Sequence, residues 1–148
     1  QFYDYRPAHL KVSNLESKSC DLTKLDFSND SITSLSCMHT VEHIGLGRYG
    51  DTIDPHGDIQ ATKELSRVLA KGGYLLFVVP VGKSRIEFNA HRIYSYEQVL
   101  ALFPDLELVE FSLVTDTVKQ GDFIVNADPK IVESQKYACG CFLFKKAP

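Results

Sequence analysis

The chain lacks several features that would assign it quickly to a class of protein. Its 148 residues carry a net charge of -3 and a sequence pI of about 5.9, so no basic face for nucleic acid is expected. No apolar run approaches the roughly 20 residues that span a membrane. No signal peptide is visible, although the sequence begins with Gln1 rather than Met. These absences predict a cytoplasmic protein that binds neither nucleic acid nor membranes.

Cysteine is scarce, and its spacing argues against a metal site. The four cysteines form no C-x-x-C pair, and they are Cys20, Cys37, Cys139 and Cys141. Cys139 and Cys141 are separated by one residue, which on a strand places both side chains on the same face. The pattern predicts reduced thiols and no zinc ion.

The composition that remains is that of a folded domain. Hydrophobic residues make up 44% of the chain, enough for one domain over 1–148 with its own core. Patterning predicts strands over 2–5, 10–12, 32–38, 74–79, 106–115 and 141–144. It predicts helices from Asp58 to about Leu69, and from a Ser95–Gln98 capping box to Phe103 before Pro104.

This order of elements predicts an α/β fold. Helices between strands favour a mainly parallel sheet with right-handed crossovers. The run 74–79 is apolar throughout, which is typical of a central strand buried on both faces, whereas the last two strands should be antiparallel. Ligands of such sheets bind at the carboxyl ends of the strands, so Asp4, Met38 and His39 are expected on one rim.

The segments at these strand ends resemble those of class I S-adenosylmethionine (SAM)-dependent methyltransferases. The likeness rests on a strand ending in Asp4, on Asp21-Leu22, on a fourth strand that leads into Glu42-His43, and on Lys71-Gly72-Gly73 before an apolar strand. The strings 42–51 and 89–95 resemble an uncharacterised branch of methyltransferase-like proteins. The resemblance implies a Rossmann-like sheet with an antiparallel C-terminal strand pair.

The resemblance also implies roles for individual residues. In that family the acid at the position of Asp4 binds the ribose of SAM, and the pair at Asp21 and Leu22 flanks the adenine. Met38 and His39 belong to the same cofactor rim. Glu42 and His43 then face the substrate, as a general base or a positioning pair. Residues expected to contact the substrate are Arg48, His91 and Arg92.

One part of the family pattern is absent from the printed sequence. The first glycine is Gly45, so neither the first family strand nor its glycine-rich loop precedes Phe2. We therefore expect an N-terminally truncated domain that binds SAM weakly or not at all. A missing mid-sheet strand exposes backbone groups, so we also expect the N-terminal segment to move onto the 32–38 strand, or a homodimer to form.

Several alternatives remain open. Gly45-x-Gly47-x-x-Gly50 has the spacing of a dinucleotide loop, but no helix opens at the third glycine. His39-x-x-Glu42-His43 has the order of an inverted zincin motif, but it leaves a strand instead of lying on a helix. Asp4 and Asp21 could instead cap turns, and Glu42 and His43 could be a structural pair.

The leading hypothesis is thus a SAM-dependent methyltransferase-like domain that acts on an unknown small molecule and is potentially inactive as this chain. A non-catalytic methyltransferase-like module for binding or assembly is the second hypothesis. A metal-dependent hydrolase built on the H-x-x-E-H string is the third. Cofactor binding separates the first two, and metal content separates the third.

Overall fold

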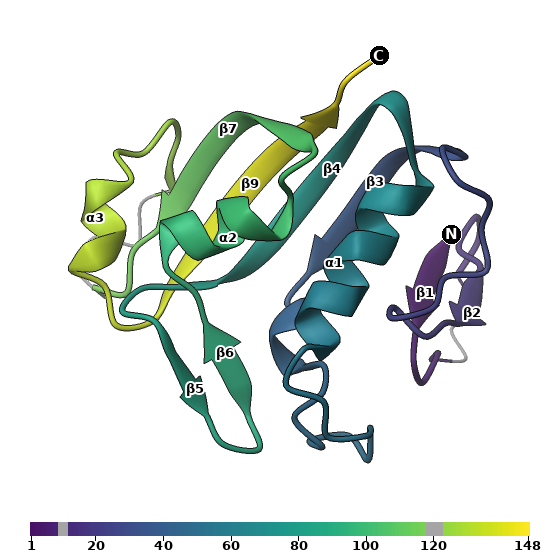
Figure 1. The fold of residues 1–148 in the computed structure, drawn as a ribbon, viewed down its shortest axis with the longest axis horizontal. Helices are drawn as coiled ribbons and strands as arrows, with labels where there is room; N and C mark the ends of the chain where they lie inside the picture. The colour runs from purple at the N-terminus through teal and green to yellow at the C-terminus, as the bar shows by residue number, and fades with distance from the viewer. Residues whose placement is uncertain (9–11, 118–122) are drawn as a thin grey trace.

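A five-stranded sheet with helices on one face forms the body of the molecule (Figure 1). The computed structural model describes residues 1–8, 12–117 and 123–148. In spatial order the sheet consists of β3 (Ile32–Met38), β4 (Leu69–Val81), β9 (Ala138–Lys146), β7 (Leu106–Val114) and β8 (Phe123–Ile124).

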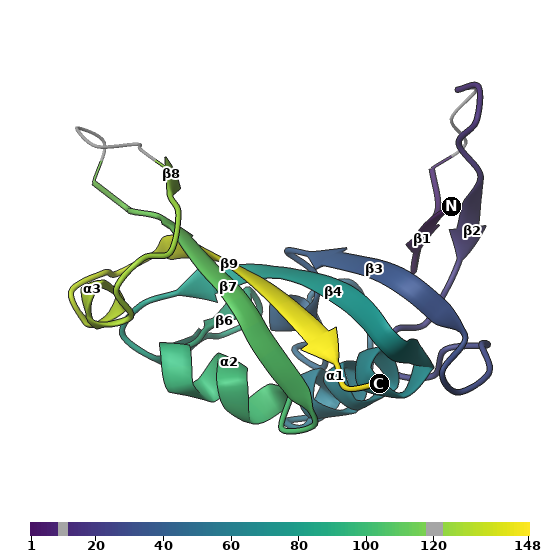
Figure 2. The ribbon, with the colours of Figure 1, turned by 90° about the horizontal axis from the view of Figure 1, so that it is seen from above.

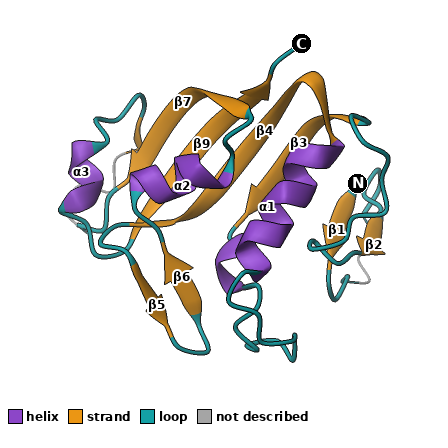
Figure 3. Ribbon diagram, viewed as in Figure 1, coloured by secondary structure: helices purple, strands orange, loops and turns teal. Residues whose placement is uncertain are grey.

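The helices and two small strand pairs complete the described structure. Seen from above, α1 (Gly57–Val68) and α2 (Tyr96–Leu102) lie on the same face of the sheet (Figure 2). The other elements are β1 (Phe2–Asp4) parallel to β2 (Ser17–Ser19), the 3-10 turn η1 (Val41–His43), the hairpin β5 (Arg85–Glu87) with β6 (His91–Ile93), and α3 (Lys130–Glu133). Figure 3 shows that β1 and β2 stand apart from the main sheet. None of the helices in the described ranges is long and apolar enough to cross a bilayer.

The predicted fold class, a Rossmann-like α/β sheet with an antiparallel C-terminal strand pair, is confirmed. β3 and β4 are parallel, β9 runs antiparallel to both β4 and β7, and β8 is antiparallel to β7. β3, β4 and β7 therefore run in one direction, and β9 lies between β4 and β7 and runs in the opposite direction. Because of this position of β9, β3 with β4 is the one parallel pairing within this described sheet, fewer than a mainly parallel sheet would have.

β4 lies at the centre of the sheet as predicted, and its alternation explains the apolar run. Leu75, Phe77 and Val79 are fully buried, on the face that the helices cover. Phe103 at the end of α2 contacts Phe77 edge-on, with ring centroids 4.8 Å apart. On the opposite face Leu76 is 39% exposed whereas Val78 is buried, so the run is buried throughout on one face and only toward its end on the other.

Several predicted boundaries need correction. α1 begins at Gly57 after His56, so Asp58 is not its N-cap but lies inside the first turn and is buried. β4 begins at Leu69 and bulges, since Ile32 pairs with Leu69 while Ser34 pairs with Tyr74.

Other differences concern short elements. β9 is longer than the predicted strand over 141–144. The strands β2, β5, β6 and β8 and the helix α3 were not predicted from the sequence. The predicted strand over 10–12 includes residues 10 and 11, which lie outside the described part of the chain. The capping box is as predicted: the Ser95 hydroxyl accepts from the amide of Gln98, whose side chain accepts from the amide of Ser95.

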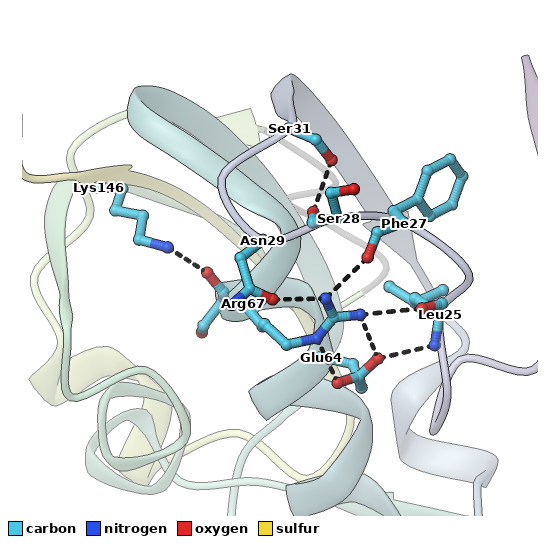
Figure 4. Close-up of polar contacts among 9 residues, drawn as sticks. Leu25, Phe27, Ser28, Asn29, Ser31, Glu64, Arg67 and Lys146 are labelled. Carbon is cyan, nitrogen blue, oxygen red and sulfur yellow. Dashed lines mark hydrogen bonds and ion pairs between the residues drawn. The ribbon is translucent and has the colours of Figure 1, made fainter.

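Arg67 fixes the segment before β3 to helix α1 (Figure 4). Its guanidinium donates to both carboxylate oxygens of Glu64, to the backbone oxygens of Leu25 and Phe27, and to Asn29 Oδ1, at 2.7–2.9 Å. The Leu25 amide donates to Glu64 Oε2 at 2.8 Å. A planar guanidinium can donate to several acceptors at once, so Arg67 alone holds the segment between β2 and β3 against α1.

Candidate functional site

A groove lies between the β1–β2 pair and the free side of β3. It has a volume of about 1380 Å³. All five residues that sequence analysis assigned to the cofactor line it, and they are Asp4, Asp21, Leu22, Met38 and His39. They come from three segments that the fold brings to one place, at the ends of β1 and β3 and after β2.

The N-terminal segment does not fill this groove. β1 pairs with β2 and not with β3, so the predicted movement of the N-terminal strand onto the 32–38 strand is wrong. β3 is paired with β4 on one side, and no other strand of the described residues pairs with it.

Asp4 and Asp21, two of the carboxylates that line the groove, each make a local turn with one oxygen. Asp4 Oδ1 accepts from the amide of Arg6 at 2.8 Å, and Asp21 Oδ1 accepts from the amide of Thr23 at 2.9 Å and from its hydroxyl at 2.6 Å. These are the turn contacts that the sequence had left as an alternative. Each acid uses Oδ1 alone in these bonds, so turn formation does not prevent the second oxygen from meeting a ligand.

Glu42 is the buried charge at the carboxyl end of β3. Its side chain is 1% exposed and lies between two imidazoles: Oε1 is 3.1 Å from His39 Nδ1 and 3.7 Å from His43 Nε2. Its other oxygen, Oε2, is buried without a hydrogen-bond partner. A buried acceptor without a partner costs free energy, and such atoms call for an explanation by function or by a bound molecule.

The tautomer of His43 follows from its neighbours. His43 Nδ1 lies 2.6 Å from the backbone oxygen of Ala90, which only accepts, so Nδ1 carries the proton. Nε2, on the side of Glu42, is then free to take up a proton. Arg48 Nη1 donates to the same Ala90 oxygen at 3.1 Å, so His43 and Arg48 meet at the loop after β5.

His91 stands beside His43 with its ring centroid 6.0 Å away, and 5.1 Å from that of Tyr137. Burial lowers the pKa of His91 below its ordinary value, and the charge of Arg48 and that of His43 when it is protonated lower it further. A neutral imidazole is thereby favoured at this position near pH 7.

Arg92, predicted to bind substrate, lies inside the protein. It is 5% exposed, its Nε is 3.3 Å from Asp58 Oδ2, and it donates to the backbone oxygens of Ile44 and Pro55. The Tyr94 hydroxyl lies 3.1 Å from the same Asp58 oxygen. Burial and the charge of Asp58 raise the pKa of Tyr94, which keeps its hydroxyl protonated as a donor. In this geometry Arg92 ties β6 to the loop before α1.

The glycine loop after η1 is closed by its own carboxylate. Gly45, Gly47 and Gly50 all have positive φ. Asp51 Oδ2 accepts from the amides of Gly45 and Gly47, at 2.8 and 3.3 Å, and Oδ1 from that of Tyr49. Burial opposes ionisation of Asp51, but these amides keep its pKa below the usual value. The backbone donors of the G-x-G-x-x-G string are thus already used.

The H-x-x-E-H string does not form the helical metal site of an inverted zincin. Its residues span the end of β3 and the 3-10 turn η1, and Glu42 lies between the two imidazoles. Within residues 1–8, 12–117 and 123–148, no group of three or more His, Cys, Asp or Glu side chains has the arrangement of a metal site.

Sequence reasoning missed Asp51, Asp58 and Tyr94. The first had a local signal, because an aspartate one residue after a glycine-rich turn commonly accepts the turn amides. The contact between Asp58 and Tyr94 joins residues 36 positions apart and has no such signal.

Comparison with known proteins agrees with this picture. The family model described as "Caenorhabditis protein of unknown function, DUF268" matches residues 11–130. A search of curated proteins gave no match. Solved structures with the same fold include a SAM-dependent methyltransferase from Thermotoga maritima, at 18% identity and a TM-score of 0.59, with 89% of this chain and 64% of that one covered.

Two further structures show how widely the fold is used. A SAM-dependent methyltransferase from Methanosarcina mazei is 15% identical, with a TM-score of 0.60 and coverage of 89% and 67%. The [4+2]-cyclase SpnF is 12% identical, with a TM-score of 0.60 and coverage of 89% and 56%. At these identities the likeness establishes the methyltransferase-like fold, and one neighbour bears the name of a different reaction.

Proposed function

Because the chain belongs to the DUF268 family and has a methyltransferase-like fold, we propose that it binds SAM in the groove beside β3 and takes part in methyl transfer to a small molecule. One observation carries the proposal. The groove gathers Asp4 and Asp21, from the separate β1–β2 pair and the segment after it, beside Met38 at the carboxyl end of β3, and ligands of α/β sheets bind at such strand ends. In this proposal Asp4 binds the ribose hydroxyls, Asp21 and Leu22 flank the adenine, and Met38 and His39 line the cofactor path.

Glu42 and His43 have the proposed role of accepting a proton from the methyl acceptor. Methyl transfer is a displacement in which alignment of the reacting atoms matters most, so the protein needs little more than a placed base. His43 is held through Nδ1 by Ala90, and the buried Glu42 lies on its Nε2 side. Arg48 and His91 border this pair, which places them for contact with a small substrate. A cytoplasmic location is part of the same proposal.

Affinity for SAM is expected to be weak. Asp51 already occupies the backbone amides of Gly45 and Gly47, in the glycine-rich loop that borders the groove. A groove that contacts ribose and adenine alone should give a dissociation constant near 1 mM, or about -4 kcal/mol.

Titration calorimetry of the 148-residue chain with S-adenosylhomocysteine, the product of SAM, tests this. Asp4→Asn and Asp21→Asn should each weaken binding by roughly tenfold, or about 1.4 kcal/mol. Asp128→Asn is the matched control, because Asp128 makes the same kind of turn contact, to the amide of Lys130 at 3.0 Å, outside the groove. Binding that is unaffected by either groove variant, or the absence of any binding at several millimolar, would refute the proposal.

A non-catalytic role in assembly is the second candidate, and the unpaired side of β3 favours it. An exposed strand edge presents amides and carbonyls that another strand can pair with. Under this proposal the domain would associate through β3 whether or not SAM is present.

A further inference from the structure

A cysteine on β9, Cys139, lies next to His39, in a chain of side chains that begins at the buried Glu42. Cys139 Sγ is 3.6 Å from His39 Nε2, and His39 Nδ1 is 3.1 Å from Glu42 Oε1. Cys139 and His39 are 100 residues apart in the sequence. Cys141 is two residues from Cys139 on β9, on the same face of the sheet. Both thiols are half-buried and form no disulfide.

The hydrogen bonds of this chain have one direction. A carboxylate only accepts, so His39 Nδ1 donates to Glu42 and its Nε2 is left facing the thiol of Cys139. That is the arrangement of a thiol, a base and an acid that orients the base. His39 adopts a φ of +50°, in the left-handed region that residues other than glycine seldom occupy. Strained backbone of this kind is often found at functional sites.

We propose that the Cys139–Cys141 pair is a reactive thiol site that exchanges with small-molecule disulfides, with His39 as its proton acceptor and Glu42 as the residue that positions His39. This activity is independent of SAM and of methyl transfer. The pair faces the side of the sheet that α1 and α2 leave uncovered, where both cysteines are partly exposed beside the buried Val78 and Ser112.

The exchange balances without an additional reactant. A thiol proton of the pair passes to His39 Nε2, and the resulting thiolate attacks one sulfur of the disulfide. A new S–S bond forms to the cysteine while the old one breaks. The departing half leaves as a thiolate and takes the proton back from His39. The cysteine is oxidised to a mixed disulfide, and one sulfur of the reagent is reduced to a thiol.

The four thiols of the chain differ in pKa, and the proposal requires the lowest value in the Cys139–Cys141 pair. Contact with Cys139 lowers the pKa of Cys141 to about 7, whereas the same contact and burial raise that of Cys139, so the two share one proton. Burial raises the pKa of Cys37 to about 12, and burial also raises that of Cys20. The thiolate is the nucleophile in exchange, so Cys37 and Cys20 should react slowly at pH 7.

Other titratable groups around the pair are few. Glu42 faces it from η1, and Glu110 lies on β7 beside Ser112, the cross-strand neighbour of Cys141. Both are acids. The charge of Glu42 raises the pKa of Cys139, so the proposed activation depends on His39 to take up the proton.

The experiment follows the reaction of the native chain with 5,5′-dithiobis(2-nitrobenzoate) from pH 5 to 10. Mass mapping after treatment with glutathione disulfide then identifies the modified cysteine. We expect one fast equivalent at pH 7, at least tenfold faster than the remaining thiols, with a midpoint near pH 7 and the label on Cys139 or Cys141. A label on Cys20 or Cys37, or a midpoint at the 8.5 of an ordinary thiol, would overturn the proposal.

Variants test the role of His39. His39→Asn should slow the fast phase by about tenfold and move its midpoint toward 8.5, since asparagine tolerates positive φ and keeps the backbone. His56→Asn, at an exposed position before α1 and outside the groove and the chain of contacts, is the matched control and should leave rate and midpoint unchanged. An unchanged rate in His39→Asn would refute the assignment of the base. If a variant fails to fold, the pH profile and the label position in the unmodified protein still test whether the Cys139–Cys141 pair is the reactive site.

Discussion

The buried Asp58 holds Tyr94 and Arg92 in place beside the loop before α1. It accepts from Tyr94 and pairs with Arg92, which in turn fixes the loop before α1 through two backbone oxygens. Removing one partner of a buried ion pair strongly destabilises the folded protein, because the other charge stays buried and unpaired.

We predict that Asp58→Asn lowers the free energy of unfolding by about 3–5 kcal/mol. The amide keeps the shape of the side chain but not its charge, which leaves Arg92 without its counter-ion. Urea unfolding followed by circular dichroism measures this. Glu87→Gln is the matched control: it breaks the exposed pair with Arg85 and should cost under about 1 kcal/mol. Equal losses in the two variants would contradict the assigned role.

At the scale of elements, the glycine loop between η1 and α1 depends on a close approach of backbones. Gly45 and Gly50 both have positive φ, but a Cβ on Gly45 would collide with the backbone oxygen of Asp54, whereas one on Gly50 meets nothing within 4 Å. The loop in turn carries Asp51 and closes one end of the groove.

Gly45→Ala should therefore destabilise the protein by about 1–3 kcal/mol more than Gly50→Ala. Both variants pay for a non-glycine residue at positive φ, but Gly45→Ala also forces the backbone apart. Thermal unfolding of the two variants side by side gives the difference. If they unfold at the same temperature, the contact with Asp54 is not a constraint on the loop.

The link between α1 and the segment before β3 should depend on pH. The hydrogen bond from Arg67 holds the pKa of Glu64 below its ordinary 4.5. Between the folded pKa and 4.5 the unfolded carboxyl binds more protons than the folded one, so its stabilisation is present above pH 4.5 and is lost as the pH falls through the folded value.

Glu64→Gln should accordingly lower the midpoint of thermal unfolding at pH 7, and the deficit relative to the unmodified chain should shrink as the pH falls below 4.5. Scanning calorimetry from pH 7 to 3 measures both. Glu133→Gln, at an exposed position of α3, is the control for simple loss of a carboxylate. A deficit for Glu64→Gln that stays constant down to pH 3 would show that the ion pair does not contribute.

For the whole molecule, the free side of β3 is the feature with most consequence for assembly. Unpaired strand edges promote association, and lysine on an edge opposes it. We predict a concentration-dependent dimer by light scattering at about 100 µM, and its weakening by Ser36→Lys, at an exposed position of β3. Ser134→Lys, exposed after α3, should leave the mass unchanged. A monomer at every concentration would exclude association through β3.

What the sequence alone determined are the features that local patterns encode. The apolar run 74–79, the Ser95 capping box, the helix before Gly72 and the antiparallel last strands were predictable because periodicity and cap chemistry act within a few residues. Asp4, Asp21, Met38 and His39 line one groove, but strand order accounts only for Met38 and His39 at the end of β3, because β1 pairs with β2 outside the five-stranded sheet.

Only the tertiary structure decided what depends on contacts between distant residues. Asp58 looks like a helix cap in the sequence, but burial against Arg92 and Tyr94 made it the partner of a charge. The short strands β2, β5, β6 and β8 form where a neighbour happens to lie, and two or three residues carry too little propensity to reveal them. The approach of Cys139 to His39 depends on the insertion of β9 beside β4, which no local pattern encodes.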